Sequence, residues 1–262
     1  MHDVPNEMKN STPKISIGLV VYNGIEHIRS ALDSIVRLSY GNIELIVVDG
    51  GSKDGTQDVL KEYAEHISVL VSEPDKGIYD AMNKVCSLAT GDWLIFLGCD
   101  DVLLDTLGNI TRLMTDPGAV YYGDVIFRSG GKIYGGKFSK FRLLKHNICH
   151  QALFYPRSVY SNYSYSLDYR LQADYAYNLS LLGLGIKFIY TGVVISLFND
   201  GGASFSSDDV DFRRDRFRLI TSSLGPVYAL LEIVLMLIKY PIKLLVPTPV
   251  WKYCQSLYRK NR

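Results

Sequence analysis

Residues 92–101 read Asp-Trp-Leu-Ile-Phe-Leu-Gly-Cys-Asp-Asp, an apolar run that ends in two adjacent carboxylates. The run from Trp93 to Leu97 has the length of a buried strand, so Asp100 and Asp101 are predicted to lie at its C-terminal end. Open α/β sheets bind their ligands at that edge, and paired carboxylates there supply hard oxygen ligands for a divalent cation. The alternative is that the two aspartates only cap a following helix, whose signals resume near Asp105.

Strand-like and helix-like runs alternate through the N-terminal half of the chain. The strand-like runs are residues 14–22, 43–48, 67–71 and 93–97, and the helix-like runs are residues 25–38, about 56–66 and 78–89. This alternation predicts an α/β fold with a mainly parallel central sheet and helices on both faces. After about Asp116 the pattern loosens, with strand signals at 120–128, 132–134, 149–155 and 186–198 and a helix signal at 171–182.

Composition excludes some classes of protein. The chain has 262 residues, enough to bury a full core, and its formal net charge of +1 argues against a nucleic-acid binder that neutralises many phosphates. Its cysteines are spaced as neither a zinc site nor a small disulfide framework, so a reducing, cytoplasmic setting is expected. These cysteines are Cys86, Cys99, Cys149 and Cys254.

The chain divides into four parts, without internal repeats or low-complexity linkers. Residues 1–13 form a polar extension that lacks the basic and apolar regions of a secretory signal. Residues 14–204 are predicted to form one α/β domain, residues 205–226 a mobile connecting segment, and residues 227–262 a separate apolar and basic segment.

Charged side chains follow three different strands of the predicted sheet. Asp49 ends the second strand, residues 73–76 follow the third, and the Asp100-Asp101 pair follows the fourth. Because the carboxyl ends of parallel strands meet at one edge of a sheet, we expect these residues to share a site there.

Three segments together resemble the inverting GT-A glycosyltransferases of the large family 2 type, which build bacterial surface polysaccharides such as colanic acid and O-antigen. The segments are Val47-Val48-Asp49-Gly50-Gly51-Ser52-Lys53-Asp54-Gly55-Thr56, then Ser72-Glu73-Pro74-Asp75-Lys76-Gly77-Ile78-Tyr79-Asp80-Ala81-Met82-Asn83-Lys84, and Gly98-Cys99-Asp100-Asp101. The likeness covers about residues 15–204. It implies that residues 14–204 form a GT-A catalytic domain with the nucleotide-diphospho-sugar transferase fold.

The resemblance also implies a donor site. Asp49 matches the aspartate that contacts the nucleotide base. Asp101 matches the metal ligand of the family's DxD-type motif, and Asp100 beside it would face the ribose or the metal. Many relatives carry a second Asp where this chain has Gly50, so base recognition rests on Asp49 and the nucleotide stays open. Three more residues are expected to border the donor pocket, unless they only form a turn capped by Asp75: Glu73, Asp75 and Lys76.

The acceptor side is expected around two later segments. In the family a carboxylate opens a helix just beyond the acceptor site, and Asp174 matches it as the base that deprotonates the acceptor hydroxyl, ahead of Asp168. The alternative for Asp174 is a structural aspartate in a first helical turn, where the helix dipole favours it. His150 and Gln151 resemble a segment of relatives that use lipid-linked acceptors, which places them on the acceptor side or near the diphosphate. A histidine in an apolar strand is often structural instead.

A polar stretch follows the domain. Residues 201–204 are expected to form a flexible segment that closes over the bound donor, with Arg213 or Arg214 contacting its diphosphate. The alternative for the two arginines is a solvated helix face of mixed charge.

The C-terminal segment is predicted to attach the protein to a membrane. Residues 227–246 are strongly apolar, and Glu232, Lys239 and Lys243 interrupt them along one helical stripe, as in an amphipathic helix at a membrane interface. The tail beyond combines basic and aromatic residues, and an anionic membrane surface attracts such a tail by about 1 kcal/mol per basic residue. The alternatives are a transmembrane span or hairpin, and a helix pair that packs on the domain or on a second copy in a homo-oligomer.

These expectations combine into one leading function. The resemblance implies an inverting glycosyltransferase that uses Mn²⁺ or Mg²⁺ to move a hexose or N-acetylhexosamine from a nucleotide sugar, expected to be a UDP-sugar, to an undecaprenyl-diphosphate-linked oligosaccharide. The enzyme would work at the cytoplasmic face of the inner membrane, and the metal would neutralise charge on the departing diphosphate.

Two other functions stay open. A sugar nucleotidyltransferase would carry a Gly-rich, basic phosphate loop after the first strand, and Tyr22-Asn23-Gly24-Ile25 is not one. The second is a non-catalytic, membrane-bound assembly protein with a degenerate fold of this type. The retained acids argue against it; they are Asp49, Asp100, Asp101 and Asp174.

Overall fold

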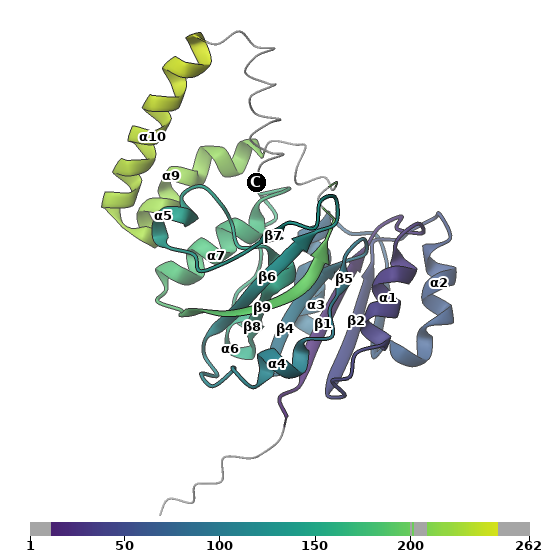
Figure 1. Ribbon diagram of the computed structural model, residues 1–262. Coiled ribbons are helices and arrows are strands. Elements are labelled where there is room, and N and C mark those ends of the chain that lie inside the picture. The colour runs from purple at the N-terminus through teal and green to yellow at the C-terminus, as the bar shows by residue number, and fades with distance from the viewer. Residues whose placement is uncertain (1–11, 200, 202–208, 246–262) are drawn as a thin grey trace, which may run out of the picture.

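The computed structural model of the protein describes residues 12–199, 201 and 209–245, and Figure 1 shows the course of the chain. Within these residues, nine strands form a mixed sheet with the order β3-β2-β1-β4-β8-β6-β9-β5, and β7 pairs with β6. The strands are β1 (Ile15–Val21), β2 (Ile43–Asp49), β3 (Val69–Ser72), β4 (Trp93–Gly98), β5 (Val102–Leu103), β6 (Val120–Phe127), β7 (Ile133–Tyr134), β8 (Leu153–Pro156) and β9 (Phe188–Phe198). The helices are α1 (Ile28–Val36), α2 (Thr56–Glu62), α3 (Ile78–Leu88), α4 (Leu107–Thr111), α5 (Lys140–Leu143), α6 (Arg157–Tyr160), α7 (Ala173–Gly183), α9 (Val210–Leu224) and α10 (Pro226–Leu245), with 3₁₀ turns η1 (Ala64–His66) and η2 (His150–Ala152).

The first four strands run parallel, as the alternation of strands and helices predicts. β1 pairs with β2 on one side and with β4 on the other, and β2 pairs with β3. The C-terminal half then adds antiparallel pairs, because β8 runs opposite to both β4 and β6. The strand predicted over residues 149–155 begins only at Leu153, since the three residues before it form η2.

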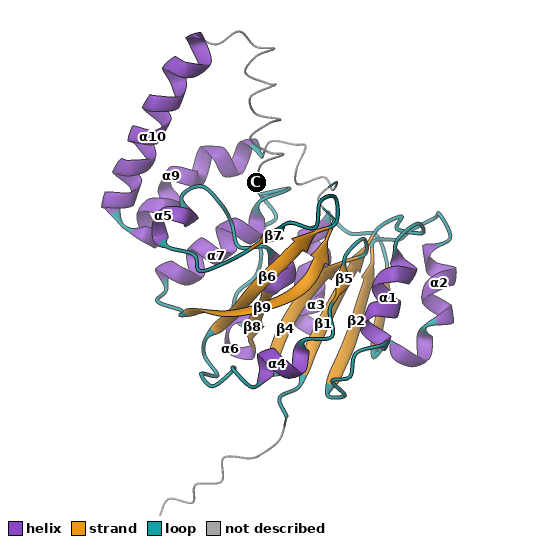
Figure 2. Cartoon of the chain, in the orientation of Figure 1, coloured by secondary structure: helices purple, strands orange, loops and turns teal. Residues whose placement is uncertain are grey.

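Helices cover both faces of the sheet (Figure 2), and the strands alternate their side chains between two cores. On β1, Ile17 and Leu19 pack into the core with residues of α1, α2 and α4, whereas Val20 packs into the core with residues of α3 and α7. Gly18 faces α3: a Cβ there would lie 2.5 Å from Cγ1 of Val85. Glycine therefore lets α3 approach the sheet closely.

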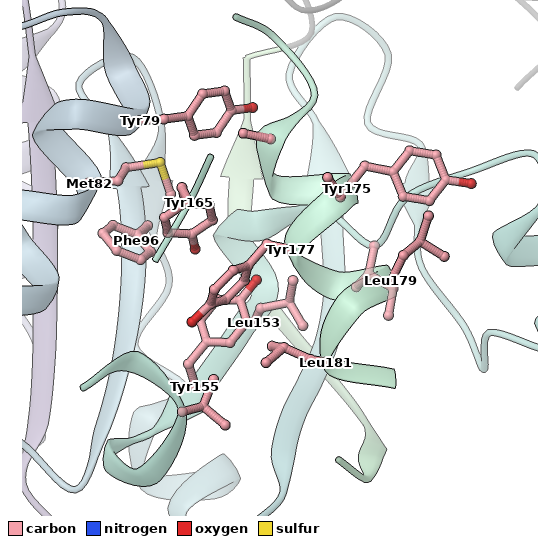
Figure 3. Packing of buried hydrophobic residues seen from close by; sticks show 14 of the residues in the cluster. Tyr79, Met82, Phe96, Leu153, Tyr155, Tyr165, Tyr175, Tyr177, Leu179 and Leu181 are labelled. Atoms are coloured by element: carbon pink, nitrogen blue, oxygen red, sulfur yellow. The ribbon is translucent and has the colours of Figure 1, made fainter. Parts of the chain in front are cut away.

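A cluster of tyrosines joins α3 to α7 (Figure 3). The ring of Tyr165 lies 5.7 Å from the ring of Tyr79 on α3 and 4.4 Å from the ring of Tyr177 on α7, measured between centroids. The ring of Tyr155 on β8 meets that of Tyr177 at 5.5 Å. These aromatic contacts hold the start of α7 in a defined position relative to α3.

Residues 210–224 form α9, so the segment predicted as a mobile connection is largely helical. Of the predicted closing segment 201–204, only Gly201 is among the described residues. Asp209 caps α9, with Oδ1 accepting the Phe212 N–H at 3.1 Å. Its Oδ2 accepts the backbone N–H groups of Leu171 and Gln172 at 2.8 and 3.1 Å. One buried carboxylate thus ties the start of α9 to the start of α7.

α10 extends beyond α9, away from the sheet (Figure 1). The face of α10 that carries Glu232 is not the exposed polar stripe that the sequence predicts. Glu232 is 6% exposed and pairs with Arg216 of α9, with Nε to Oε1 at 2.7 Å, so this acid faces the protein and not the solvent. The side chains of Lys239 and Lys243 lie outside the described residues. The exposed row on α10 is apolar, namely Val227, Leu230, Val234 and Leu237. In the part of the chain that the structure describes, no helix combines the length and the apolarity that crossing a bilayer requires.

Candidate active site

Asp49 is the last residue of β2 and lies fully buried at the carboxyl edge of the sheet. The Ser72 hydroxyl donates to its Oδ2 at 2.6 Å, and the backbone N–H of Ser52 lies 3.2 Å from both carboxylate oxygens. Asp49, the residue predicted to contact the nucleotide base, therefore also ties β2 to β3 and to the loop that follows β2.

The three charged residues predicted after β3 have different surroundings. Oδ1 of Asp75 accepts the backbone N–H of the residue two positions later at 2.8 Å, so it does cap the turn. Its Oδ2 reaches over Gly50 of the neighbouring loop. Glu73 pairs with Lys84 of α3 at 2.8 Å, and Lys76 is exposed. Of the three, Asp75 is the residue whose side chain turns toward the loop after Asp49.

Asp100 and Asp101 follow β4 but lie in unlike environments. Asp101 is 1% exposed. Its carboxylate accepts hydrogen bonds from the Gly98 N–H (3.2 Å), from Gln151 Nε2 (2.8 Å) and from the Asn199 N–H (2.9 Å). Asp100 is partly exposed, and its Oδ2 accepts a bond from Asn199 Nδ2 at 2.9 Å. Burial raises the pKa of the Asp101 carboxyl to about 6, although its hydrogen bonds act in the opposite direction.

This carboxylate pair suits a Mn²⁺ or Mg²⁺ ion that is shared with a substrate. Magnesium in particular is commonly held by one or two protein carboxylates together with substrate phosphates and water. Among the residues that the structure describes, no group of three or more His, Cys, Asp or Glu side chains could hold a metal by itself.

A pocket of about 430 Å³ opens beside the carboxylate pair. It is lined by His150, Gln151 and Asp174, the three residues predicted for the acceptor side. Gln151 also donates to Asp101 at 2.8 Å, so its side chain contacts the carboxylate pair as well as the pocket. The structure thus brings the predicted acceptor residues next to the predicted metal residues.

Asp174 lies in the first turn of α7, with 13% of its side chain exposed. The Tyr79 hydroxyl donates to its Oδ1 at 3.0 Å, and Asn147 Nδ2 donates to its Oδ2 at 2.7 Å. Nδ1 of His150 lies 3.5 Å from the same Oδ2. Asp168, the other carboxylate considered for the base, is exposed and does not line this pocket.

Two arginines other than Arg213 and Arg214 lie at the site. Arg213 and Arg214 are exposed on α9, and Arg214 pairs with two acids of its own helix at 2.8 and 3.3 Å, as on a helix face of mixed charge. Arg216 lines the pocket. The Arg128 guanidinium donates to the backbone carbonyl of Asp100 at 2.9 Å, which places a positive charge beside the carboxylate pair.

Four residues of this site are absent from the sequence predictions: Arg128, Asn147, Asn199 and Arg216. Arg128 and Asn199 directly follow β6 and β9, so a search for polar residues after every strand would have found both. Asn147 and Arg216 carry no local signal, because a loop and a helix reach the site only in the folded chain.

Sequence comparison adds independent information. Residues 16–169 match the profile described as Glycosyl transferase family 2. A PGL/p-HBAD biosynthesis glycosyltransferase of Mycobacterium bovis (strain BCG / Pasteur 1173P2) is 39% identical over 213 residues, which cover 77% of this chain and 83% of that protein.

Solved structures share the architecture. S. aureus TarS 1–349 in complex with UDP-GlcNAc superposes with a TM-score of 0.64 and 18% identity, covering 80% of this chain and 66% of that one. In a longer structure of TarS, the match spans 39% of the TarS chain. The mannosyltransferase PcManGT from Pyrobaculum calidifontis, in complex with GDP-Man and Mn²⁺, gives a TM-score of 0.61 at 16% identity, covering 94% of this chain and 85% of that one. At these identities the likeness concerns the fold alone.

Proposed function

Since this chain belongs to glycosyl transferase family 2 and has the GT-A fold, we propose that it is an inverting, metal-dependent enzyme that transfers a hexose or N-acetylhexosamine from a nucleotide sugar. One observation carries the proposal: Gln151 donates to Asp101 of the carboxylate pair and also lines the pocket of Asp174. A donor diphosphate at the pair and an acceptor hydroxyl in the pocket would then be neighbours.

On the donor side, the geometry favours Asp100 over Asp101 as the carboxylate that binds Mn²⁺ or Mg²⁺. Asp101 is buried and already accepts three hydrogen bonds, which suits a residue that positions the loop after β4. Asp100 is partly exposed and is oriented by Asn199. When bound, the ion would neutralise negative charge on the departing diphosphate, a contribution worth several kcal/mol.

For the nucleotide, we propose UDP. The TarS complex holds UDP-GlcNAc, whereas the PcManGT complex holds GDP-Man, so the fold itself accommodates either base. The acids proposed to contact the nucleoside are Asp49, which ends β2, and Asp75, whose Oδ2 reaches over the adjacent Gly50.

For the acceptor, we propose an undecaprenyl-diphosphate-linked sugar at the cytoplasmic face of the inner membrane. The support is the exposed apolar row of α10, formed by Val227, Leu230, Val234 and Leu237. Its members are three or four positions apart and share one helix face, as in a helix that lies in a membrane interface.

Calorimetric titration separates this function from the alternatives. UDP-sugars and GDP-sugars are titrated into the protein with and without Mn²⁺, and transfer to an undecaprenyl-diphosphate-linked monosaccharide is then measured. We expect metal-dependent binding of one UDP-sugar followed by transfer. Binding without transfer would favour the non-catalytic assembly protein, and formation of a nucleotide sugar from a nucleoside triphosphate and a sugar phosphate would favour the nucleotidyltransferase.

A further inference from the structure

The pocket beside Asp174 is lined by more basic side chains than acidic ones. Asp174 is the one acid among the described residues of its lining, and the basic residues are Lys145, His146, His150 and Arg216. Nδ1 of His150 lies 3.5 Å from the Asp174 carboxylate, so this histidine belongs to the acid. The other three remain as an excess of basic groups, and a cleft lined by charge of one sign attracts ligands of the opposite sign.

Arg216 reaches this pocket from α9, and its guanidinium is fixed by surrounding groups. Its Nε donates to Glu232 Oε1 at 2.7 Å, and its Nη2 donates to the backbone carbonyl of Leu144. The guanidinium carbon lies 5.5 Å from the ring centroid of Tyr175. Because Leu144 directly precedes Lys145, the arginine lies against the segment that carries the other two bases. Lys145, His146 and Arg216 are called the basic end of the pocket below.

The basic end has the chemistry of a phosphate subsite. A guanidinium carries five N–H groups in a planar fork, so the bonds to Glu232 and Leu144 leave others for a ligand in the pocket. Such a fork matches two phosphate oxygens at once, and the Lys145 ammonium adds a second positive charge nearby. The Arg216 and Glu232 side chains are only 18% and 8% exposed. A buried ion pair is weak evidence for a purely stabilising role, because apolar side chains of similar volume often stabilise a fold equally well.

α10 brings the basic end close to the proposed membrane surface. This helix packs on α9 (Figure 1), and one of its faces presents Glu232 to Arg216. On the same helix, Leu230 and Leu237 are 62% and 64% exposed as part of the apolar row. A single helix therefore separates the surface proposed to dock on lipid from the arginine that lines the pocket.

We propose that Arg216 and Lys145 bind the diphosphate of a polyisoprenyl-diphosphate-linked acceptor, an inference that rests on the proposed glycosyl transfer. The isoprenoid chain follows the exposed row of α10 into the membrane interface, and the acceptor sugar lies between the diphosphate and Asp174. No bond to the acceptor phosphates is made or broken. Arg216 and Lys145 are thus specificity-determining residues for the acceptor, and Glu232 is a positioning residue that orients the guanidinium.

Two acceptors that differ only in the diphosphate test this subsite. One is undecaprenyl-diphosphate-linked N-acetylglucosamine, and the other is the undecaprenyl glycoside of the same sugar. Transfer from the UDP-sugar with Mn²⁺ is measured for both, and the ratio of their kcat/KM values reports recognition of the diphosphate. For the wild type we expect a ratio of about ten or more in favour of the diphosphate, because each hydrogen bond between charged groups is worth about 1.5–3 kcal/mol.

Variants of the basic end should lower this ratio. Arg216→Gln leaves the buried Glu232 charge without a partner, so the double variant Arg216→Gln/Glu232→Gln is compared beside it. We expect the double variant to lower the ratio about tenfold, mainly through the KM of the diphosphate acceptor. Lys145→Gln, at an exposed side chain that need not disturb folding, should lower it about threefold because solvent screens its charge. Lys61→Gln, 71% exposed on α2, is the matched control and should leave the ratio unchanged.

The ratio separates recognition from folding, because a merely structural defect lowers transfer to both acceptors alike. Equal kcat/KM values of the wild type for the two acceptors would overturn the subsite while the glycosyl transfer stands. A normal ratio in both Lys145→Gln and the double variant would overturn it as well. Absence of transfer by the wild type to either acceptor, from UDP-sugars and GDP-sugars alike, would instead overturn the proposed function.

Discussion

Asp75 occupies the space that a side chain at Gly50 would need. A Cβ built on Gly50 lies 2.6 Å from Oδ2 of Asp75, closer than real Cβ atoms approach an oxygen. The Asp75 carboxylate therefore belongs to the turn after β3 and also fills the space beside the loop after β2. The family resemblance implies a second acid at the position of Gly50, and here the structure places a carboxylate from another strand end beside that position.

This relationship predicts a reciprocal effect of substitutions. Gly50→Asp should weaken binding of the donor nucleotide at least tenfold, because the new side chain meets Asp75 and brings two like charges together. Asp75→Asn keeps an oxygen for the turn and should also weaken binding. The double variant Gly50→Asp/Asp75→Asn should recover most of the affinity, measured by calorimetry. An Asp75→Asn protein that binds the donor as the wild type does would contradict the role of Asp75.

The two aspartates after β4 should respond differently to loss of charge. Asp100→Asn should lower kcat by two orders of magnitude or more, weaken Mn²⁺ binding in the presence of donor, and leave the melting temperature unchanged. Asp101→Asn should lower the free energy of unfolding by about 1–3 kcal/mol, because its amide would face three buried donors that need an acceptor. Thermal melts and metal titrations distinguish them. If Asp101→Asn is stable but no longer binds metal, and Asp100→Asn binds metal normally, then Asp101 is the metal ligand.

Membrane attachment should depend on the exposed face of α10. Leu230 and Leu237 are 62% and 64% exposed, so the double variant Leu230→Gln/Leu237→Gln should keep its thermal stability but lose flotation with anionic liposomes. Leu70→Gln on the edge strand β3, where the leucine is 43% exposed, is the matched control and should float normally. Equal flotation of both variants would exclude α10 as the docking face.

Glu44 should make stability depend on pH in acid. Burial disfavours its charge, but hydrogen bonds from Lys14, Ser16 and Thr90 outweigh burial and lower the pKa to about 2 from an ordinary value of 4.5. Because the folded pKa is lower than the unfolded one, this stabilisation is complete above pH 4.5 and is lost as pH falls toward 2. Glu44→Gln should cost on the order of 2 kcal/mol at pH 7, allowing for solvent screening, and little near pH 2.

Urea unfolding at several pH values measures this difference. Glu65→Gln, at a side chain that is 82% exposed, is the control and should change the free energy of unfolding little at any pH. A Glu44→Gln penalty that does not shrink in acid would argue that the lost stability comes from packing and not from charge.

The sequence by itself determined the parallel half of the sheet and the edge where the site lies. The run from Trp93 to Leu97 and the helix-period residues of α1 and α3 are local patterns, and hydrophobic periodicity acts over a few turns or one strand. Asp49 and Asp100 directly follow such runs, so their place at the carboxyl edge needed no tertiary information. The matched family profile over residues 16–169 agrees with the predicted fold.

Only the tertiary structure decided what each of these acids is free to do. Asp101 differs from Asp100 because Asn199, 98 positions later in the chain, and Gln151 donate to it. Asp174 is oriented by Tyr79 and Asn147, which donate to it from other elements. The availability of a carboxylate depends on which donors surround it, and those donors are distant in sequence. Glu232 is a similar case. Its place on a helix is a local property, but it faces inward because its ion pair with Arg216 forms only when α9 and α10 pack together.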